Sequence, residues 1–432
     1  MESSKVLFGM VYRVSERLHT LDGDLRMKKS LIALAALASV AGAAQAQSTA
    51  TIYGTLDVGA GSFSQQVGSA AKTTQQGLMY NNNDSSRWGI LAVEDLGGGM
   101  KAQFQAESWI GSLPRNNFGY NSAANGADGT SSGSSTFATS GVGNTIDATS
   151  FGNRILTASL TMGSHTIQAG QNSAFVRDIA VPYQADGSNV VGNLVGNDSV
   201  ITGRNVAANY IYNANGLTAA VGVTSNTKLK DGTADAGTGS GYQAKARYAQ
   251  GAWSVAGAYS VANTDTAAVS AVTGLQVANG TNTLSTYTGT IASGYTAIIP
   301  AVAAAAAKST KTTTTVMAAD YDLTVAKLFA EYGKVEAKET NADATLNNRH
   351  AVSVGARVPV GKAWAFVQYS DGKQQNSTGY NGTWTGYSVG ARYEFSKRTY
   401  AYLVDGHSDY QYTAAGDKLK ANQYALGLVH NF

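Results

Sequence analysis

The chain has 432 residues, a formal net charge of +3, only 14% charged residues and no cysteine. So small a net charge gives no electrostatic support for nucleic-acid binding, and a chain without cysteine has neither a disulfide framework nor a thiolate metal site. The five histidines are scattered without metal-ligand spacing. We therefore expect no metal site, and we also expect no cofactor and no catalytic centre.

Residues 27–46 resemble an export signal. The segment Met27-Lys28-Lys29 is positively charged, residues 31–40 are apolar, and Ala44-Gln45-Ala46 has the small-x-small form of a cleavage site. The apolar part is too short to span a bilayer, and no run of 18 apolar residues follows it. We expect three segments: a mis-assigned N-terminal extension, a cleaved signal peptide and the mature chain, at residues 1–26, 27–46 and 47–432.

Period-two alternation dominates the mature chain and indicates β-strands. In residues 387–395 the odd positions are apolar or aromatic and the even positions are small or charged; residues 242–248 and 351–357 alternate in the same way. We expect sixteen strands, near residues 49–63, 84–95, 99–110, 150–162, 164–171, 203–213, 217–226, 241–250, 253–262, 312–322, 325–337, 347–358, 363–371, 384–396, 399–408 and 421–432.

The expected connections are short and long in turn. Glycine-rich short ones such as Leu96-Gly97-Gly98-Gly99 alternate with long ones, at residues 64–83, 111–149, 172–202, 227–240, 263–311, 338–346, 372–383 and 409–420. Tyrosines near strand ends match the interfacial girdles of membrane barrels. The pattern predicts an all-β protein, a 16-stranded antiparallel transmembrane β-barrel with short periplasmic turns and long extracellular loops, wide enough for a water-filled channel.

Four segments resemble the Gram-negative general porin family, particularly its beta-proteobacterial, Neisseria-like branch. They are spaced over the mature chain, and comprise residues 85–107 (SSRWGILAVEDLGGGMKAQFQAE), 52–57 (IYGTLD), 396–402 (SKRTYAY) and 427–432 (GLVHNF). The chain departs from the family pattern at Leu91, Ala92 and Gln171, which bears on pore size and ion preference.

The resemblance implies a homotrimeric outer-membrane channel for passive diffusion of ions and small hydrophilic solutes, with the third long loop folded into the barrel. It also implies outer-membrane lipid, lipopolysaccharide and the barrel-assembly machinery as partners. In this family the C-terminal aromatic residue, here Phe432, forms part of the assembly signal.

The same resemblance assigns arginines to the wall of a constriction. Arg87 and Arg154 match wall arginines of the second and fourth strands, and Arg204 resembles a third one. The parity of Arg204 is that of the apolar Val206 and of Tyr210, so we expect it to face inward only if its strand begins after it.

Acidic residues of the third long loop are expected to oppose these arginines, since opposed charges set a field within a pore. The candidates are Asp178, Asp186 and Asp198. Other charges with inward parity are expected to line the lumen more broadly: Lys245, Arg247, Arg357, Arg392 and Glu394.

Three alternatives remain open. A substrate-specific channel keeps the fold but uses aromatic residues in the lumen, whereas most aromatic residues here have outward parity. An adhesin or purely structural barrel would bind cells or matrix through its loops and would not conduct. An outer-membrane hydrolase would need serine, histidine and acidic groups placed for proton transfer, and the histidine pattern does not support it.

Overall fold

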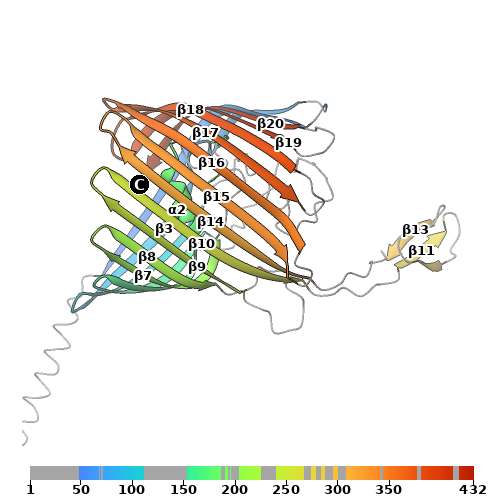
Figure 1. Cartoon of the computed structure of the whole chain (residues 1–432), viewed down its shortest axis with the longest axis horizontal. Helices are drawn as coiled ribbons and strands as arrows, with labels where there is room; N and C mark the ends of the chain where they lie inside the picture. Colours follow the sequence, from blue (N-terminus) through green and yellow to red (C-terminus); the bar gives the residue numbers. More distant parts are fainter. Residues whose placement is uncertain are drawn as a thin grey trace, which may run out of the picture.

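A computed structural model gives the architecture of the chain (Figure 1). The structure describes residues 48–67, 69, 72–110, 152, 154–185, 190–192, 195, 204–224, 240–266, 274–278, 284–287, 295–299, 308–340, 344–376, 381–411 and 418–432. The expected extension and signal peptide, residues 1–46, lie outside the described residues.

Long antiparallel strands form nearly all of the described structure. They are β1 Thr49–Val67, β2 Thr73–Tyr80, β3 Arg87–Gly97, β4 Met100–Trp109, β5 Ile155–Met162, β6 His165–Ser173, β7 Arg204–Ala214, β8 Leu217–Thr224, β9 Gly241–Gln250, β10 Trp253–Thr266, β14 Lys308–Asp322, β15 Lys327–Glu339, β16 Ala344–Val360, β17 Ala363–Asn376, β18 Asn381–Glu394, β19 Thr399–Gln411 and β20 Lys418–Asn431. A separate three-stranded sheet contains β11 Gly274–Ala278, β12 Leu284–Tyr287 and β13 Tyr295–Ile299.

The large sheet closes on itself as a barrel. Strand β1 pairs with β20 on one side; on the other side its first half pairs with β3 and its second half with β2. Since β2 and β3 share one position in the wall, the seventeen strands of the sheet make a closed wall of sixteen. Closure of the wall removes the open sheet edge that a strand structure in hydrocarbon cannot have; among the described strands, β2 pairs only with β1. The expected 16-stranded antiparallel barrel is confirmed.

Tight turns join strands at one rim. Gly163 and Gly361 begin two-residue turns with φ of +59° and +62°, in the left-handed region that residues with a Cβ rarely adopt. The glycines that marked short connections in the sequence therefore mark turns in the structure. Figure 1 shows the strands running obliquely around the wall between this rim and the other.

The outer face of the wall is apolar, with aromatic residues toward both rims. On β10, Trp253, Val255 and Tyr259 are exposed, and on β18 so are Tyr387 and Tyr393. In each pair the two aromatic residues are six positions apart in sequence, which places their rings roughly 20 Å apart along the strand. An apolar band flanked by aromatic girdles is the surface expected of a barrel in lipid.

A segment between β6 and β7 packs against the inner face. It contains helix α2, Phe175–Ala180, and the 3-10 helix η1, Val181–Tyr183. The apolar side chains of Phe175, Ile179 and Tyr183 are buried in one cluster with inward residues of β10, β14 and β15. Figure 1 shows α2 within the outline of the barrel. Among the described residues, no helix is long and apolar enough to cross a membrane.

Several strands are longer than the alternation predicts. Residues 64–83 were expected to form a loop, but β1 continues to Val67 and β2 occupies part of the interval. Strand β17 continues past its predicted end at residue 371 to Asn376. There the outward side chains change from Val367 and Tyr369 to the exposed Asp371 and Lys373. Backbone pairing therefore continues into residues whose outward side chains are no longer apolar, and the alternation of apolar and polar residues cannot predict it.

Candidate functional site on the inner wall

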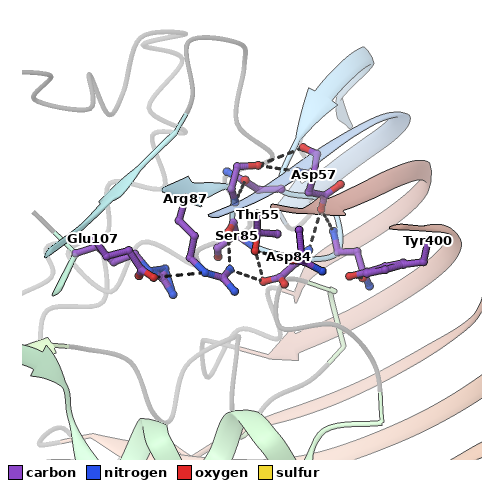
Figure 2. Close-up of polar contacts among 12 residues, drawn as sticks. Thr55, Asp57, Asp84, Ser85, Arg87, Glu107 and Tyr400 are labelled. Carbon is purple, nitrogen blue, oxygen red and sulfur yellow. Dashed lines mark hydrogen bonds and ion pairs between the residues drawn. The ribbon is translucent and has the colours of Figure 1, made fainter. Parts of the chain in front are cut away.

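Two predicted arginines converge on a buried carboxylate of the wall. Glu107 lies on β4 with its side chain 5% exposed, and the Arg154 Nε donates a hydrogen bond to its Oε1. The Nε of Arg87, at the start of β3, lies 3.7 Å from Glu107 Oε2. Figure 2 shows Arg87 and Glu107 pointing toward one another. A buried carboxylate is stable when it is paired in this way, so the two arginines are held on one side of the lumen.

The indole ring of Trp109 makes cation–π contacts with two of the three predicted arginines. The guanidinium carbon of Arg154 lies 4.4 Å from the centre of the Trp109 ring, and that of Arg204 lies 4.8 Å from it. Strand β7 includes Arg204 as its first residue, so the condition under which we expected it to face inward, a strand that begins after it, is not met. At the strand end its long side chain reaches the ring in spite of its parity.

The inner segment adds an arginine that the sequence interpretation missed. Arg177 lies on α2, within electrostatic reach of Arg87 and Arg154. Burial lowers the pKa of the Arg177 guanidinium, while the carboxylates of Asp178 and Asp84 act in the opposite direction. A helix of six residues has too few turns for a recognisable pattern, so no signal in the sequence identified this residue.

A second group of cations forms a ladder with aromatic rings across five adjacent strands. Arg357 on β16 lies between Phe329 on β15 and Trp364 on β17, with its guanidinium carbon 5.2 Å and 4.2 Å from the ring centres. Arg392 on β18 lies 5.3 Å from the Trp364 ring centre and 3.3 Å from that of Tyr400 on β19. Stacking of this kind fixes guanidinium groups that would otherwise be mobile.

An ion pair and several hydrogen bonds from wall cations connect the wall with the inner segment. Lys245 Nζ lies 2.8 Å from Asp178 Oδ2, and Arg247 Nε donates to the hydroxyl of Tyr183 at 3.3 Å. Arg357 Nη2 donates to the carbonyl oxygens of Gln184 and Ala185, each at 3.3 Å. These predicted lumen cations therefore hold the inner segment to the wall.

Three wall glutamines fix the backbone of the same segment. Gln243 on β9, Gln368 on β17 and Gln423 on β20 are each about 98–100% buried. Their Oε1 atoms accept hydrogen bonds from the backbone N–H groups of Phe175, Ala185 and Val191 at 3.1, 2.8 and 2.9 Å. Because the three strands lie far apart around the barrel, the segment follows a long arc of the inner wall.

Glycines let this segment lie close to the wall. A Cβ on Gly386 of β18 would lie 2.5 Å from the carbonyl oxygen of Gly192, and one on Gly406 of β19 would collide with the carbonyl oxygen of Val191. These contacts leave no room for a larger residue.

The remaining predicted residues have the following positions. Arg392 Nη2 lies 3.2 Å from Glu394 Oε1. The backbone N–H of Phe432 donates to Gly54 O at 3.0 Å, and Gly54 N–H donates to Phe432 O at 3.1 Å, which ties the chain end to β1. Asp186 and Asp198 lie outside the described residues. Of the three candidate acids, the structure therefore describes only Asp178, whose partner is Lys245.

Around Glu107, the described part of the wall and inner segment carries more positive than negative charge. Arg87, Arg154, Arg177 and Arg204 come together with the carboxylates of Glu107 and Asp84. The nearby Asp178 is balanced by Lys245, so the excess is two positive charges. The sequence interpretation missed both acids. Glu107 shares the parity of Gln103 and Gln105 and is opposite to the exposed Phe104, which would have identified it as inward.

Comparison with known proteins gives consistent results. A family model described as "Gram-negative porin" matches residues 33–413. An outer membrane porin protein of Bordetella pertussis is 40% identical over 96 residues, 20% of this chain and 25% of that protein. Outer membrane porin protein 32 of Delftia acidovorans is 43% identical over 95 residues, 22% of this chain and 26% of the other. These alignments cover about a quarter of each relative.

Solved structures share the fold. The anion-selective porin from Comamonas acidovorans superposes with a TM-score of 0.59 at 19% identity, covering 89% of this chain and 100% of that one. A loop L8 deletion mutant of OmpT, an outer membrane protein of Vibrio cholerae, gives a TM-score of 0.56 at 15% identity, with 89% and 99% coverage.

Proposed function

The chain belongs to the Gram-negative porin family, and we propose that it is a channel through which ions and small hydrophilic solutes diffuse passively. Its location is the outer membrane. The observation that carries the proposal is a closed wall of sixteen strands, apolar outside, whose inner face presents fixed arginines and carboxylates. A barrel of this strand number leaves an aqueous channel, and passive diffusion needs no chemical step.

We propose that Arg87, Arg154 and Arg204 line the narrowest part of this channel, together with Arg177. Asp178, Asp186 and Asp198 are proposed as acids of the facing loop, and Lys245, Arg247, Arg357, Arg392 and Glu394 as further lumen charges. The excess positive charge around Glu107 supports a preference for anions, because fixed charges of one sign attract counter-ions into a pore. The anion selectivity named for the Comamonas porin is consistent with this preference.

The proposal includes the biogenesis expected from the sequence. Residues 27–46 act as a signal peptide that is cleaved near Ala46, the tight turns face the periplasm and the long loops face the exterior. The C-terminal Phe432 acts as part of the signal for the barrel-assembly machinery. The assembled protein is a homotrimer surrounded by lipid and lipopolysaccharide; a trimer form is named for OmpT of Vibrio cholerae, a structural neighbour.

A liposome-swelling assay tests passive diffusion. Vesicles that contain the refolded protein should swell in isotonic solutions of small neutral sugars, and the rate should fall smoothly with solute size. Absence of swelling above that of protein-free vesicles would reject the channel. Rapid swelling with one sugar and not with others of equal size would favour the substrate-specific alternative.

A further inference from the structure

A short turn inside the barrel is anchored on a buried carboxylate. The turn, residues 81–86, joins β2 to β3, and Asp57 of β1 lies next to it with no exposed surface. Asp57 Oδ2 accepts hydrogen bonds from the backbone N–H groups of Asn83 and Asp84 at 2.7 and 2.8 Å, and Asp57 Oδ1 accepts one from the Tyr402 hydroxyl at 2.6 Å. Figure 2 shows Asp57 beside Asp84 of the turn.

Both ends of the turn also bond to the backbone of Asp57. The N–H of Asn81 donates to Asp57 O at 3.3 Å, and the N–H of Asp57 donates to Ser86 Oγ at 2.9 Å. Asn81 has φ of +59°, a conformation that asparagine tolerates better than most residues, and its Oδ1 accepts from Ser86 N–H at 2.6 Å. Asp57 is therefore the centre of the turn's hydrogen bonding.

Two more wall strands hold the turn. The Tyr400 hydroxyl of β19 donates to Asn83 Oδ1 at 3.3 Å, and Gln423 Nε2 of β20 donates to Asn82 O at 3.0 Å. With Asp57 on β1, three neighbouring strands fix the turn to the inner wall.

The turn presents a carboxylate to a predicted pore arginine. Arg87 Nη1 lies 3.1 Å from Asp84 Oδ1 and donates to Ser85 O at 2.7 Å. Ser85 N–H donates to the same Asp84 oxygen at 2.6 Å. Arg87 is thereby shared between Asp84 on the turn and Glu107 on the opposite side. Figure 2 shows Arg87 between these two carboxylates.

We propose that Asp57 is a positioning residue for ion preference: by fixing the 81–86 turn, it keeps Asp84 against Arg87 and so sets how much positive charge Arg87 presents to the lumen. This proposal rests on the proposed channel function. Asp57 itself is buried and acts through Asp84.

Reversal potentials in a salt gradient test the proposal. Asp84→Asn removes one of the two countercharges of Arg87 and should shift the permeability ratio toward anions. Asp57→Glu keeps the charge but adds a methylene that displaces the turn, so it should shift the ratio in the same direction. Tyr402→Phe, a milder change, should give a smaller shift of the same sign. In the Asp84→Asn background, Asp57→Glu should add little, because residues that act through one another are not additive.

A thiol reagent tests the turn's position without using conductance. The chain has no cysteine and Ser85 is buried, so Ser85→Cys should react slowly. Adding Asp57→Glu should speed the reaction by about tenfold, which corresponds to about 1.4 kcal/mol. The exposed Ser240 gives the control, since Ser240→Cys should react at one rate with either residue at position 57.

The outcomes separate the two proposals. A wild-type protein that does not conduct rejects the channel function. A conducting protein in which Asp57→Glu and Tyr402→Phe leave the reversal potential unchanged overturns the role of Asp57, as does full additivity with Asp84→Asn. Equal thiol reactivity with and without Asp57→Glu overturns it independently. If Asp57→Glu does not assemble, Tyr402→Phe tests the role of Asp57 instead, by its reversal potential and by the thiol reactivity of Ser85→Cys in the same background.

Discussion

Lys245 and Asp178 form an ion pair, Nζ to Oδ2 at 2.8 Å, that joins wall strand β9 to helix α2. Asp178→Asn should leave Lys245 without its countercharge and shift permeability toward anions, whereas Lys245→Gln should shift it toward cations. Because both side chains are partly exposed, solvent and salt screen each charge, so we expect a modest change in each permeability ratio. Reversal potentials of both variants check this, and shifts of the same sign would contradict it.

Substitution of Arg154 should have a larger effect than substitution of Lys245, because its partner Glu107 is buried. Arg154→Ala removes a fixed positive charge and the shorter of the two ion pairs that the structure describes for Glu107, leaving the one to Arg87. We expect a shift toward cation permeability and a loss of barrel stability approaching the roughly 3–5 kcal/mol of a broken buried pair. Reversal potential and the thermal midpoint of barrel unfolding measure the two effects. Arg154→Lys, which keeps the charge, should largely preserve ion preference; an equal shift in both variants would argue against a charge effect.

Gln368 should help to keep the segment between β6 and β7 against the inner wall. Gln368→Leu leaves the backbone N–H of Ala185 buried without its acceptor, at a cost of about 1–3 kcal/mol. We expect a lower thermal midpoint and more open-channel current noise, because the segment is less firmly held. The exposed Gln375 lies on the same strand, and Gln375→Leu should change neither quantity. Equal noise in wild type and Gln368→Leu would show that this bond does not restrain the segment.

Gly386 should be required for close packing of the same segment. Gly386→Ala places a methyl group 2.5 Å from Gly192 O, an overpacking that costs about 1–3 kcal/mol. The segment should move off the wall toward the lumen, so single-channel conductance should fall. Gly257→Ala is the matched control, since its Cβ would meet only Val316 O at 3.6 Å. An unchanged conductance in Gly386→Ala would contradict the packing described.

The barrel could be predicted because lipid and water impose alternation on each strand. Tyr387, Val389 and Tyr393 face outward, while Ser388 is buried on the inner side, as the residue pattern indicates. The pattern ends where a strand leaves the apolar band, so the polar extension of β17 past residue 371 was not predicted.

The site could be predicted only in part. Wall cations such as Lys245 and Arg357 follow from parity, but their partners on the inner segment depend on tertiary packing between residues far apart in sequence. Arg204 shows the limit of parity at a strand end, where a long side chain reaches the Trp109 ring from the first residue of β7. The sequence placed Asp57 only within the segment 52–57 that resembles the family's first strand. Its contacts could not be predicted, because they join it to residues 83, 84 and 402, which are distant in sequence.

The central claim is that this barrel conducts ions through a lumen with excess fixed positive charge. Planar bilayers that contain the refolded wild-type protein, held across a potassium chloride gradient, test it most directly. We predict stepwise conductance with a reversal potential of the sign set by chloride permeability. A reversal potential of the sign set by potassium would contradict the positive lumen, and the absence of conductance steps would contradict the channel itself.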